Sequence, residues 1–493
     1  MKESFDIIVI GSGAGLMLME SALANGLNCA IIEKSKFGGT CLTKGCIPSK
    51  MLVYPADLIR ESEKADRVGV SFKKPFVDWE KVSKRMWQQI NYSEKMETNL
   101  KQLKNLQVFN GTAEFTGEKT LRVKQNDGSY SHEIKGKTII VAPGSRSFVP
   151  PIKNIEQTGY VTSETFFGEK FPKKLWDSVI IVGGGAVSAE FAHIFSSFGT
   201  KVTIVETKSR ILFSEEEEIS AFVEAEFKNN SIDILLNSNV ISSKKLNAFK
   251  TLTVENTVTK EVVDISADEI FIASGIQSNG DILRLENTDI QTDERGWIKT
   301  NEYLETTQKD VYAIGDINGK YQLRHKANYE AEILMHNLFS DGAKKAACYN
   351  AVPWAVFTNP QVAHVGMTER EAKNLGIQYW VGKNFFSQIA GGTAMGITDD
   401  SSDNGFVKII VGKEKTILGA HVVGPHASIL VQPFVYLMNA NHKCENRQIE
   451  KIGNIACPQL GSYMPINDSM IIHPSLNELT AWVIGNIDWK DKK

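Results

Sequence analysis

The chain has 493 residues and a net charge of −3, with 42% hydrophobic and 23% charged residues, which is the balance of a globular protein of about three domains. The small net charge gives no electrostatic case for nucleic-acid binding, and the apolar stretches are interrupted before the roughly 18 residues of a membrane span. The first residues enter an apolar strand without a leader segment, and six cysteines do not make a secreted disulfide scaffold, so we expect a cytoplasmic protein.

The N-terminal segment predicts a strand, a glycine-rich turn, a helix and a second strand. This is the fingerprint of a dinucleotide-binding fold, in which Gly11 makes the tight turn and Gly13 lets the backbone approach a pyrophosphate at a helix N-terminus. Glu33, at the end of the second strand, is placed to bond a ribose hydroxyl. Gly15 stands one residue before the usual third glycine position, which holds Leu16, so slightly looser helix–strand packing is expected.

Two cysteines, Cys41 and Cys46, follow this unit at a spacing of five. Five residues of helix rise about 7.5 Å, whereas the Cα atoms of a disulfide lie within about 6.8 Å. A bond between them therefore requires a break in the helix, which Gly45 permits, and a helix can begin around Pro48. A ring this small stabilises a fold little, so an accessible disulfide here favours a redox function.

A zinc site is the alternative for this pair, and it needs a second pair of ligands at metal spacing. His442 and Cys444 are adjacent but isolated, so no metal site is predicted. Cys29 lies in an apolar strand and is expected in the core. Cys348, Cys444 and Cys457 are expected to be plain thiols.

Residues 51–105 predict two helices, the second beginning near Asp78. Its apolar residues recur at helical spacing and are expected in the core: Trp79, Val82, Met86 and Ile90. Residues 107–141 predict strands, with a turn at 126–128. Pro143 follows the last strand and removes a backbone donor.

Residues 177–190 repeat the first fingerprint, so Gly183 and Gly185 correspond to Gly11 and Gly13. Ser188 holds the third position and is small enough for close packing. The similarity between the apolar runs that end near Ser145 and near Ile276 supports an internal duplication.

Glu206 ends the second strand of this repeat. A carboxylate there bonds a ribose 2′-hydroxyl and repels a 2′-phosphate, so NAD is favoured over NADP. Lys208 and Arg210 are nearby cations and keep NADPH as the alternative. The acidic run at 215–218 is expected to be a solvated helix start, favoured by the macrodipole.

The segment GGTCLTKGCIPSK, residues 38–50, resembles the active-site segment of the flavin-dependent pyridine nucleotide–disulfide oxidoreductases. The resemblance extends over nearly the whole chain. It implies an α/β fold with two Rossmann-like domains, for FAD and NAD, and a C-terminal α+β dimerisation domain. The implied boundaries are 1–150 and 283–348 for FAD, 151–282 for NAD(P) and 349–493 for dimerisation.

The resemblance also implies a catalytic set. A substrate dithiol would attack Cys41, and Cys46 would pass electrons to the flavin. His473, in the segment HPSLNE, would be the base, and Glu478 would orient it. In this family the histidine and the cysteines come from different subunits, so a homodimer is implied.

Cofactor residues follow from the same resemblance. Lys50 is expected near the flavin, paired with Glu190, and Asp316 is expected to accept a hydrogen bond from the ribityl chain. The residues expected to bind FAD are Gly11, Gly13, Gly15, Glu33, Gly39, Thr40, Lys50, Ala113, Gly144, Ser145, Asp316 and Ala327. Those expected to bind NAD are Gly183, Gly185, Glu190, Glu206, Val240 and Gly275.

The leading hypothesis is a dihydrolipoamide dehydrogenase, which would serve lipoyl domains of a 2-oxo acid dehydrogenase or glycine-cleavage complex. Glu206 supports it, as does the run 323–327, which resembles that enzyme's Leu-Ala-His-Lys-Ala with Arg324 in place of alanine. The alternative is an NADPH-dependent reductase of a small disulfide, like mycothione reductase, supported by residues 427–433, where dihydrolipoamide dehydrogenases usually have a glutamate at Ile429. A mercuric reductase and a redox-inert FAD-binding scaffold are disfavoured. The long segment 456–470 is expected to shape the substrate entrance.

Overall fold

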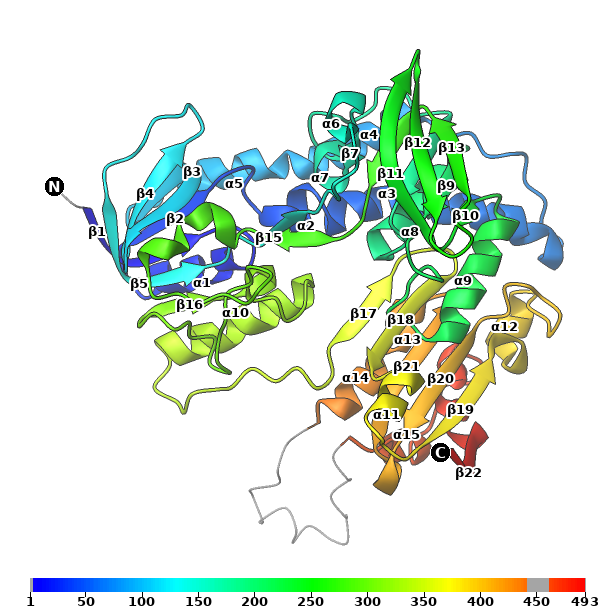
Figure 1. Cartoon of the computed structure of the whole chain (residues 1–493). Coiled ribbons are helices and arrows are strands. Elements are labelled where there is room, and N and C mark those ends of the chain that lie inside the picture. The colour runs from blue at the N-terminus through cyan, green and yellow to red at the C-terminus, as the bar shows by residue number, and fades with distance from the viewer. Residues whose placement is uncertain (1–2, 441–460, 493) are drawn as a thin grey trace, which may run out of the picture.

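The structure is a computed structural model and describes residues 3–440 and 461–492. In these ranges three large sheets of six, five and six strands organise the chain. Figure 1 shows two α/β units, drawn from blue to green, with the third sheet, yellow to red, beside the second of them. Among the described helices none is long and apolar enough to cross a bilayer.

The first unit is built on parallel strands in the order β3–β2–β1–β5–β16, with β4 antiparallel to β3 and β5. Its strands are β1 (Glu3–Ile10), β2 (Cys29–Glu33), β3 (Leu106–Gly117), β4 (Thr120–Gln125), β5 (Ile134–Val141) and β16 (Val311–Ala313). Its helices are α1 (Gly15–Ala24), α2 (Gly39–Thr43), α3 (Cys46–Lys64), η1 (Ala65–Val68), α4 (Trp79–Ile90), α5 (Tyr92–Leu100), η2 (Gly280–Leu283), η3 (Leu285–Asn287), η4 (Gly315–Asn318) and α10 (Arg324–Phe339). Helices α1 and α10 lie together against the sheet, and Cys29 is fully buried beneath them, as predicted.

Helix α1 packs tightly on the central strand. A Cβ atom at Gly15 would lie 2.6 Å from Val9 Cγ1. The expectation of looser packing is therefore wrong at this point. Gly15, one residue before the usual third glycine position, lets the helix backbone approach the strand closely.

The predicted second helix of residues 51–105 is two helices, α4 and α5, separated at Asn91. Asp78 caps α4, accepting a hydrogen bond from Lys81 N at 3.0 Å. Met86 and Ile90 are buried, and the other two predicted apolar residues pack against the same cluster. The turn at 126–128 is present, closed by a hydrogen bond from Gly128 N to Gln125 O.

The second unit repeats the strand order of the first, with parallel strands β10–β9–β8–β14–β7. Its strands are β7 (Val161–Thr162), β8 (Ser178–Val182), β9 (Lys201–Val205), β10 (Asp233–Leu235) and β14 (Glu269–Ile272), and an antiparallel sheet of β11 (Ser238–Leu246), β12 (Phe249–Asn256) and β13 (Val262–Ala267) lies beside them. Its helices are α6 (Ile155–Thr158), α7 (Ser163–Phe166), α8 (Ala186–Ser197) and α9 (Glu217–Asn229). Strands β6 (Ser145–Ser147) and β15 (Ile276–Ser278) pair antiparallel, so the segments that directly follow the two similar apolar runs join the units.

The third sheet is antiparallel, in the order β17–β18–β21–β20–β19–β22. Its strands are β17 (Pro353–Val356), β18 (Gln361–Gly366), β19 (Tyr379–Phe385), β20 (Phe406–Val411), β21 (Ile417–Gly424) and β22 (Ile487–Lys492). The helices around it are α11 (Glu369–Asn374), η5 (Phe386–Gln388), α12 (Ala390–Ala394), η6 (Lys413–Lys415), α13 (Ala427–Leu430), α14 (Gln432–Met438), α15 (Met464–Asn467), α16 (Asn477–Trp482) and η8 (Val483–Asn486). Their apolar faces form a separate core with the sheet.

The acidic run before α9 is not solvated at its start, so that expectation is wrong. Glu215 is 1% exposed and Glu216 is 5% exposed. Glu216 accepts a hydrogen bond from the buried Lys408 Nζ of β20 at 2.8 Å, and Glu215 contacts His364 of β18. The carboxylates are buried because the third sheet supplies basic partners for them.

Candidate active site

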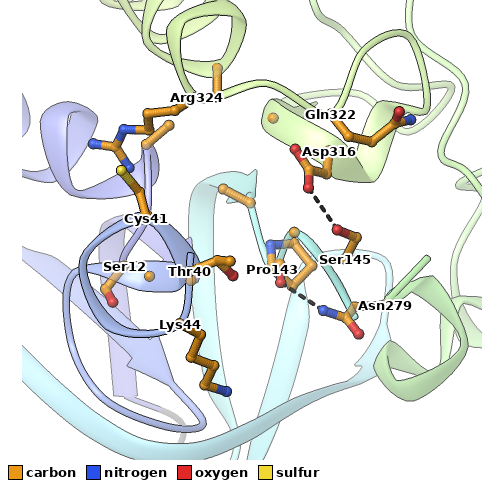
Figure 2. A pocket seen from close by; sticks show the side chains of 18 of the residues that line it. Ser12, Thr40, Cys41, Lys44, Pro143, Ser145, Asn279, Asp316, Gln322 and Arg324 are labelled. Atoms are coloured by element: carbon orange, nitrogen blue, oxygen red, sulfur yellow. Dashed lines mark hydrogen bonds between the residues drawn. The ribbon is translucent and has the colours of Figure 1, made fainter. Parts of the chain in front are cut away.

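A cavity of about 940 Å³, including space open to solvent, lies at the carboxyl ends of β1, β2 and β5. Ligands of parallel α/β sheets bind at this edge. Figure 2 shows how Thr40 and Cys41 on one side face Ser145 and Asp316 on the other. The predicted FAD residues that line the cavity are Gly11, Gly13, Glu33, Gly39, Thr40, Gly144, Ser145, Asp316 and Ala327, together with Cys41 and Cys46.

Glu33 braces the glycine-rich turn that forms one wall. Its carboxylate accepts hydrogen bonds from Ser12 N at 2.9 Å and from Ser12 Oγ at 2.8 Å. A Cβ atom at Gly11, whose φ is 94°, would lie 2.1 Å from Ala142 O, so only glycine fits there. Ser12 was not among the predicted residues, although its position between two fingerprint glycines was a usable signal.

A buried ionic network holds the opposite wall. Lys326 Nζ donates to Gly315 O at 2.9 Å and lies 3.0 Å from Glu330 Oε1. Glu330 Oε2 accepts from Gly315 N at 2.7 Å. These bonds fix the loop that carries Asp316, whose carboxylate accepts from Ser145 Oγ at 2.6 Å. Burial raises the pKa of Asp316 above its ordinary value.

The walls of this cavity fit a dinucleotide such as FAD. A Cβ atom at Gly144 would meet no heavy atom within 4 Å, and one at Gly13 would meet only the Arg324 guanidinium, at 3.9 Å. The backbone is thus open beside the N-terminus of α1, where a pyrophosphate is favoured by free amides and the helix dipole. Glu33 supplies the acid at the neighbouring strand end.

The cysteine pair lies at the break between α2 and α3, with Gly45 outside both helices, as the spacing requires. Helix α3 begins at Cys46, slightly before the predicted Pro48. Both cysteines are free thiols. The Cys41 thiol donates a hydrogen bond to the Cys46 sulfur, which lowers the pKa of Cys46, with a smaller contribution from the Lys50 charge, and raises the pKa of Cys41. Cys46 is therefore the thiol that ionises first.

Lys50 and Glu190 form the predicted pair. Lys50 Nζ lies 2.9 and 2.8 Å from the two Glu190 carboxylate oxygens, and 4.2 Å from the centre of the Phe357 ring. Glu190 Oε1 also accepts from Phe357 N at 3.0 Å. Sequence reasoning missed Phe357, which comes from the segment between β17 and β18.

His473 and Glu478 also form the predicted pair, with Nδ1 2.5 Å from Oε1. The Glu478 side chain is 1% exposed and that of His473 is 67% exposed. Donation from Nδ1 to the carboxylate leaves the other ring nitrogen, Nε2, facing outward as a proton acceptor. Within one chain, neither residue lines the cysteine cavity.

Glu206 has the same relation to the second glycine-rich turn as Glu33 has to the first. Its Oε2 accepts from Gly184 N at 2.5 Å and its Oε1 from Lys208 N at 2.8 Å. Gly183 and Gly275 follow β8 and β14, so with Glu206 they lie at the carboxyl ends of the strands. The repeated bracing supports the internal duplication.

The cations near Glu206 differ in how far they are engaged. Arg210 donates to Phe213 O at 2.9 Å and to Glu217 Oε1 at 3.1 Å. Lys208 lies over the Phe213 ring, 4.5 Å from its centre. Arg210 is thereby committed to these two partners, whereas the Lys208 ammonium is seen only over this ring in the described part of the chain.

Several predicted residues lie outside the cavity. Gly15 packs against β1, and Ala113 lines a smaller neighbouring cavity with Gly11 and Glu33. The Val240 side chain belongs to the core beside β8. Three residues considered from the sequence lie outside the described residues: His442, Cys444 and Cys457. The start of the predicted entrance segment, 456–460, lies outside them as well.

Two tandem dinucleotide folds with a cysteine pair at the first define the class of flavin-dependent disulfide oxidoreductases. Residues 5–331 match the profile of the family "Pyridine nucleotide-disulphide oxidoreductase", and residues 352–457 match that family's dimerisation domain. The chain belongs to this family, and its fold is the expected pair of Rossmann-like domains followed by a dimerisation domain.

Relatives within the family carry different names. A dihydrolipoyl dehydrogenase of Bacillus subtilis is 32% identical over 441 residues, 87% of this chain and 91% of that protein. A mycothione reductase of Mycobacterium tuberculosis is 32% identical over 448 residues, 89% of this chain and 93% of that protein. Among solved structures, the Cu(II) complex of the HOCl-induced flavoprotein disulfide reductase RclA from Escherichia coli has a TM-score of 0.81 at 28% identity and covers 99% of both chains.

Proposed function

We propose that this protein is an NAD-linked dithiol–disulfide oxidoreductase that oxidises dihydrolipoamide through FAD and the Cys41–Cys46 pair. The observation that carries the proposal is the position of the pair. Both cysteines line the cavity that fits FAD, and Cys46, the more acidic thiol, stands four residues before the Lys50–Glu190 pair.

FAD, when bound, supplies the electron acceptor for the dithiol and the hydride donor for the nicotinamide. In the oxidised enzyme a substrate thiolate attacks Cys41, the Cys41–Cys46 bond breaks, and Cys46 leaves as a thiolate. The second substrate thiolate then displaces Cys41, which releases the substrate as a disulfide and leaves both cysteines reduced.

His473 takes the proton from the attacking substrate thiol, and Glu478 holds its ring and stabilises the imidazolium. Since one chain does not place His473 in the cysteine cavity, we propose that a second copy supplies it. The dimerisation domain and its exposed apolar side chains, among them Ile429, Tyr436 and Ile472, support a homodimer.

NAD is the proposed nicotinamide. Glu206 places a carboxylate beside Gly184 N, where a 2′-phosphate would be repelled. Arg210 is committed to Phe213 O and Glu217, so one of the two cations that favoured NADPH is engaged elsewhere. A cytoplasmic location, with a lipoyl domain of a 2-oxo acid dehydrogenase or glycine-cleavage complex as partner, is part of the proposal.

The second candidate is an NADPH-dependent reductase of a small disulfide, as in mycothione reductase. Arg324 favours a substrate other than lipoamide, because it places a cation beside Cys41 where dihydrolipoamide dehydrogenases carry alanine (Figure 2). Ile429, where those enzymes usually carry glutamate, is 65% exposed, and this difference also favours the second candidate.

Steady-state turnover of the purified holoenzyme separates these candidates. The three pairs compared are NAD⁺ with dihydrolipoamide, NADPH with mycothiol disulfide, and NADH with Cu(II), the last because of the RclA complex. We expect the first pair to turn over fastest, by at least about tenfold. Faster turnover of either other pair would overturn the proposed substrate while leaving the family chemistry intact.

A further inference from the structure

Three potential metal ligands meet where the second dinucleotide unit contacts the third sheet. His364 of β18 and His421 of β21 are directly paired across the two strands, and their rings stack with centres 5.5 Å apart. Glu215, two residues before α9, reaches them from the other unit, with Oε2 2.8 Å from His364 Nδ1. One carboxylate and two imidazoles therefore converge at a buried point, although they are far apart in sequence.

Two atoms of this cluster have no hydrogen-bond partner among the residues that the structure describes. His421 is 0% exposed and contacts Met367 O through Nε2 at 2.8 Å, which makes Nε2 the donor and leaves an unpartnered lone pair on Nδ1. Glu215 is 1% exposed, and its Oε1 is also without a partner. Leaving such atoms buried and unsatisfied is costly, so a ligand that satisfies both is favoured.

We propose that Glu215, His364 and His421 bind a divalent transition-metal ion of the Zn²⁺ class. The candidate ligand atoms all lie within 4.8 Å of one another. Ligand atoms on a tetrahedral zinc lie roughly 3.4 Å apart, so small side-chain rotations that draw them inward complete the site. Two imidazoles and one carboxylate are a common ligand set for such ions, with water at the fourth position.

The surroundings agree with this assignment. The His421 tautomer that donates to the Met367 carbonyl is the one in which the other ring nitrogen is free to ligate, and such a carbonyl is a typical second partner of a metal-bound histidine. The buried Lys408 of β20 is already paired with Glu216 and Glu369. Lys408 therefore does not compete with an ion for Glu215 Oε1. An ion pair between His364 and Glu215 gives Glu215 Oε2 a partner. It gives no partner to Glu215 Oε1 or to His421 Nδ1.

A metal here would join the second dinucleotide unit to the dimerisation sheet. It stands apart from the cysteine cavity, since none of the three residues lines that cavity. Binding to the folded state alone would raise the unfolding temperature in proportion to metal occupancy. The site would thus stabilise the position of one unit relative to the other.

The test uses the full-length holoenzyme carrying Cys41→Ser and Cys46→Ser, so that the cysteine pair does not compete for metal. A chelator first removes bound metal, and the protein is then dialysed against Zn²⁺ and afterwards against metal-free buffer. Bound zinc is measured by mass spectrometry. The unfolding temperature is measured on the same samples. The same measurements follow for Glu215→Gln and His421→Gln in this background. His426→Asn is the matched control, because His426 is exposed on the loop after β21 and has the left-handed φ of 59° that asparagine tolerates.

We expect about one zinc per chain and a zinc-dependent rise in unfolding temperature in the background protein and in the His426→Asn control. Glu215→Gln and His421→Gln should weaken zinc binding by more than about 100-fold. If His421→Gln does not fold, as judged by flavin content, the isosteric Glu215→Gln decides the matter. Absence of zinc in the background protein, or equal zinc in the Glu215→Gln variant, would overturn the proposal.

Discussion

Lys50 Nζ lies 2.8 Å from Glu190 Oε2 and joins α3, the helix that begins at Cys46, to α8, the helix that follows the second glycine-rich turn. The ion pair therefore ties the redox cysteines to the unit proposed to hold the nicotinamide. The Lys50 charge also lowers the pKa of Cys46.

Replacing Lys50 with methionine should slow dithiol oxidation, because the Cys46 thiolate loses its nearest cation and its pKa rises. We expect kcat to fall by about tenfold at pH 7 and to recover in part at higher pH, where the thiolate forms without help. The pH profile of kcat measures this. Lys81→Met, on the exposed face of α4, is the control, and a parallel fall in that variant would contradict the assignment.

The reduced enzyme should react with iodoacetamide at Cys46 before Cys41. The hydrogen bond from Cys41 lowers the pKa of Cys46 and raises its own. As the pH falls through the Cys46 pKa, the thiolate is protonated and alkylation should stop, whereas Cys41 should react only at much higher pH. Peptide mapping by mass spectrometry across the pH range identifies the first labelled residue. Labelling of Cys41 first at neutral pH would show that the hydrogen bond runs in the opposite direction.

Replacing Lys326 with methionine should destabilise the protein by about 3–5 kcal/mol, because the buried Glu330 loses its charge partner. The loop of Asp316 should loosen as well, so FAD should be lost more readily. Denaturant unfolding and the ratio of flavin to protein after gel filtration measure the two effects. Lys344→Met removes an exposed pair with Glu305 and should cost no more than about 1 kcal/mol. Equal stability of the two variants would refute the role of the buried network.

Replacing Arg324 with alanine should weaken FAD binding. Its guanidinium lies beside Gly13 at the open N-terminus of α1, where a pyrophosphate is expected. A charged hydrogen bond contributes about 1.5–3 kcal/mol, so we expect the FAD dissociation constant to rise by about 10- to 100-fold. Fluorescence titration of the apoprotein measures it, with the exposed Arg295→Ala as control. Unchanged FAD affinity together with a raised KM for an anionic disulfide would instead assign Arg324 to the substrate.

Local sequence patterns were sufficient for much of this fold. Both glycine-rich turns, the acids that follow them and the helix break at Gly45 were predictable, because each depends on neighbours within one βαβ unit or one turn. The Lys50–Glu190 and His473–Glu478 pairs were reachable through family resemblance. The domain boundaries and the catalytic roles stay predictions.

The error at the acidic run arose because distant segments decide the outcome. The run from Glu215 looked like a solvated helix start, but Lys408 and His364 of the third sheet bury its first two carboxylates. No local pattern predicts that contact, since the partners lie more than a hundred residues away. The division of α4 from α5 at Asn91 was missed for a different reason. The apolar periodicity of the sequence continues across Asn91 and so predicts a single helix.

The central claim is tested most directly by nicotinamide preference in dihydrolipoamide oxidation, measured for the wild-type holoenzyme and for Cys46→Ser. The account predicts that kcat/KM for NAD⁺ exceeds that for NADP⁺ by at least about 100-fold in the wild type. It also predicts that Cys46→Ser binds FAD normally and loses dihydrolipoamide oxidation by at least about 1000-fold, because no thiolate remains to reduce the flavin. A preference for NADP⁺, or retained activity in Cys46→Ser, would contradict the account.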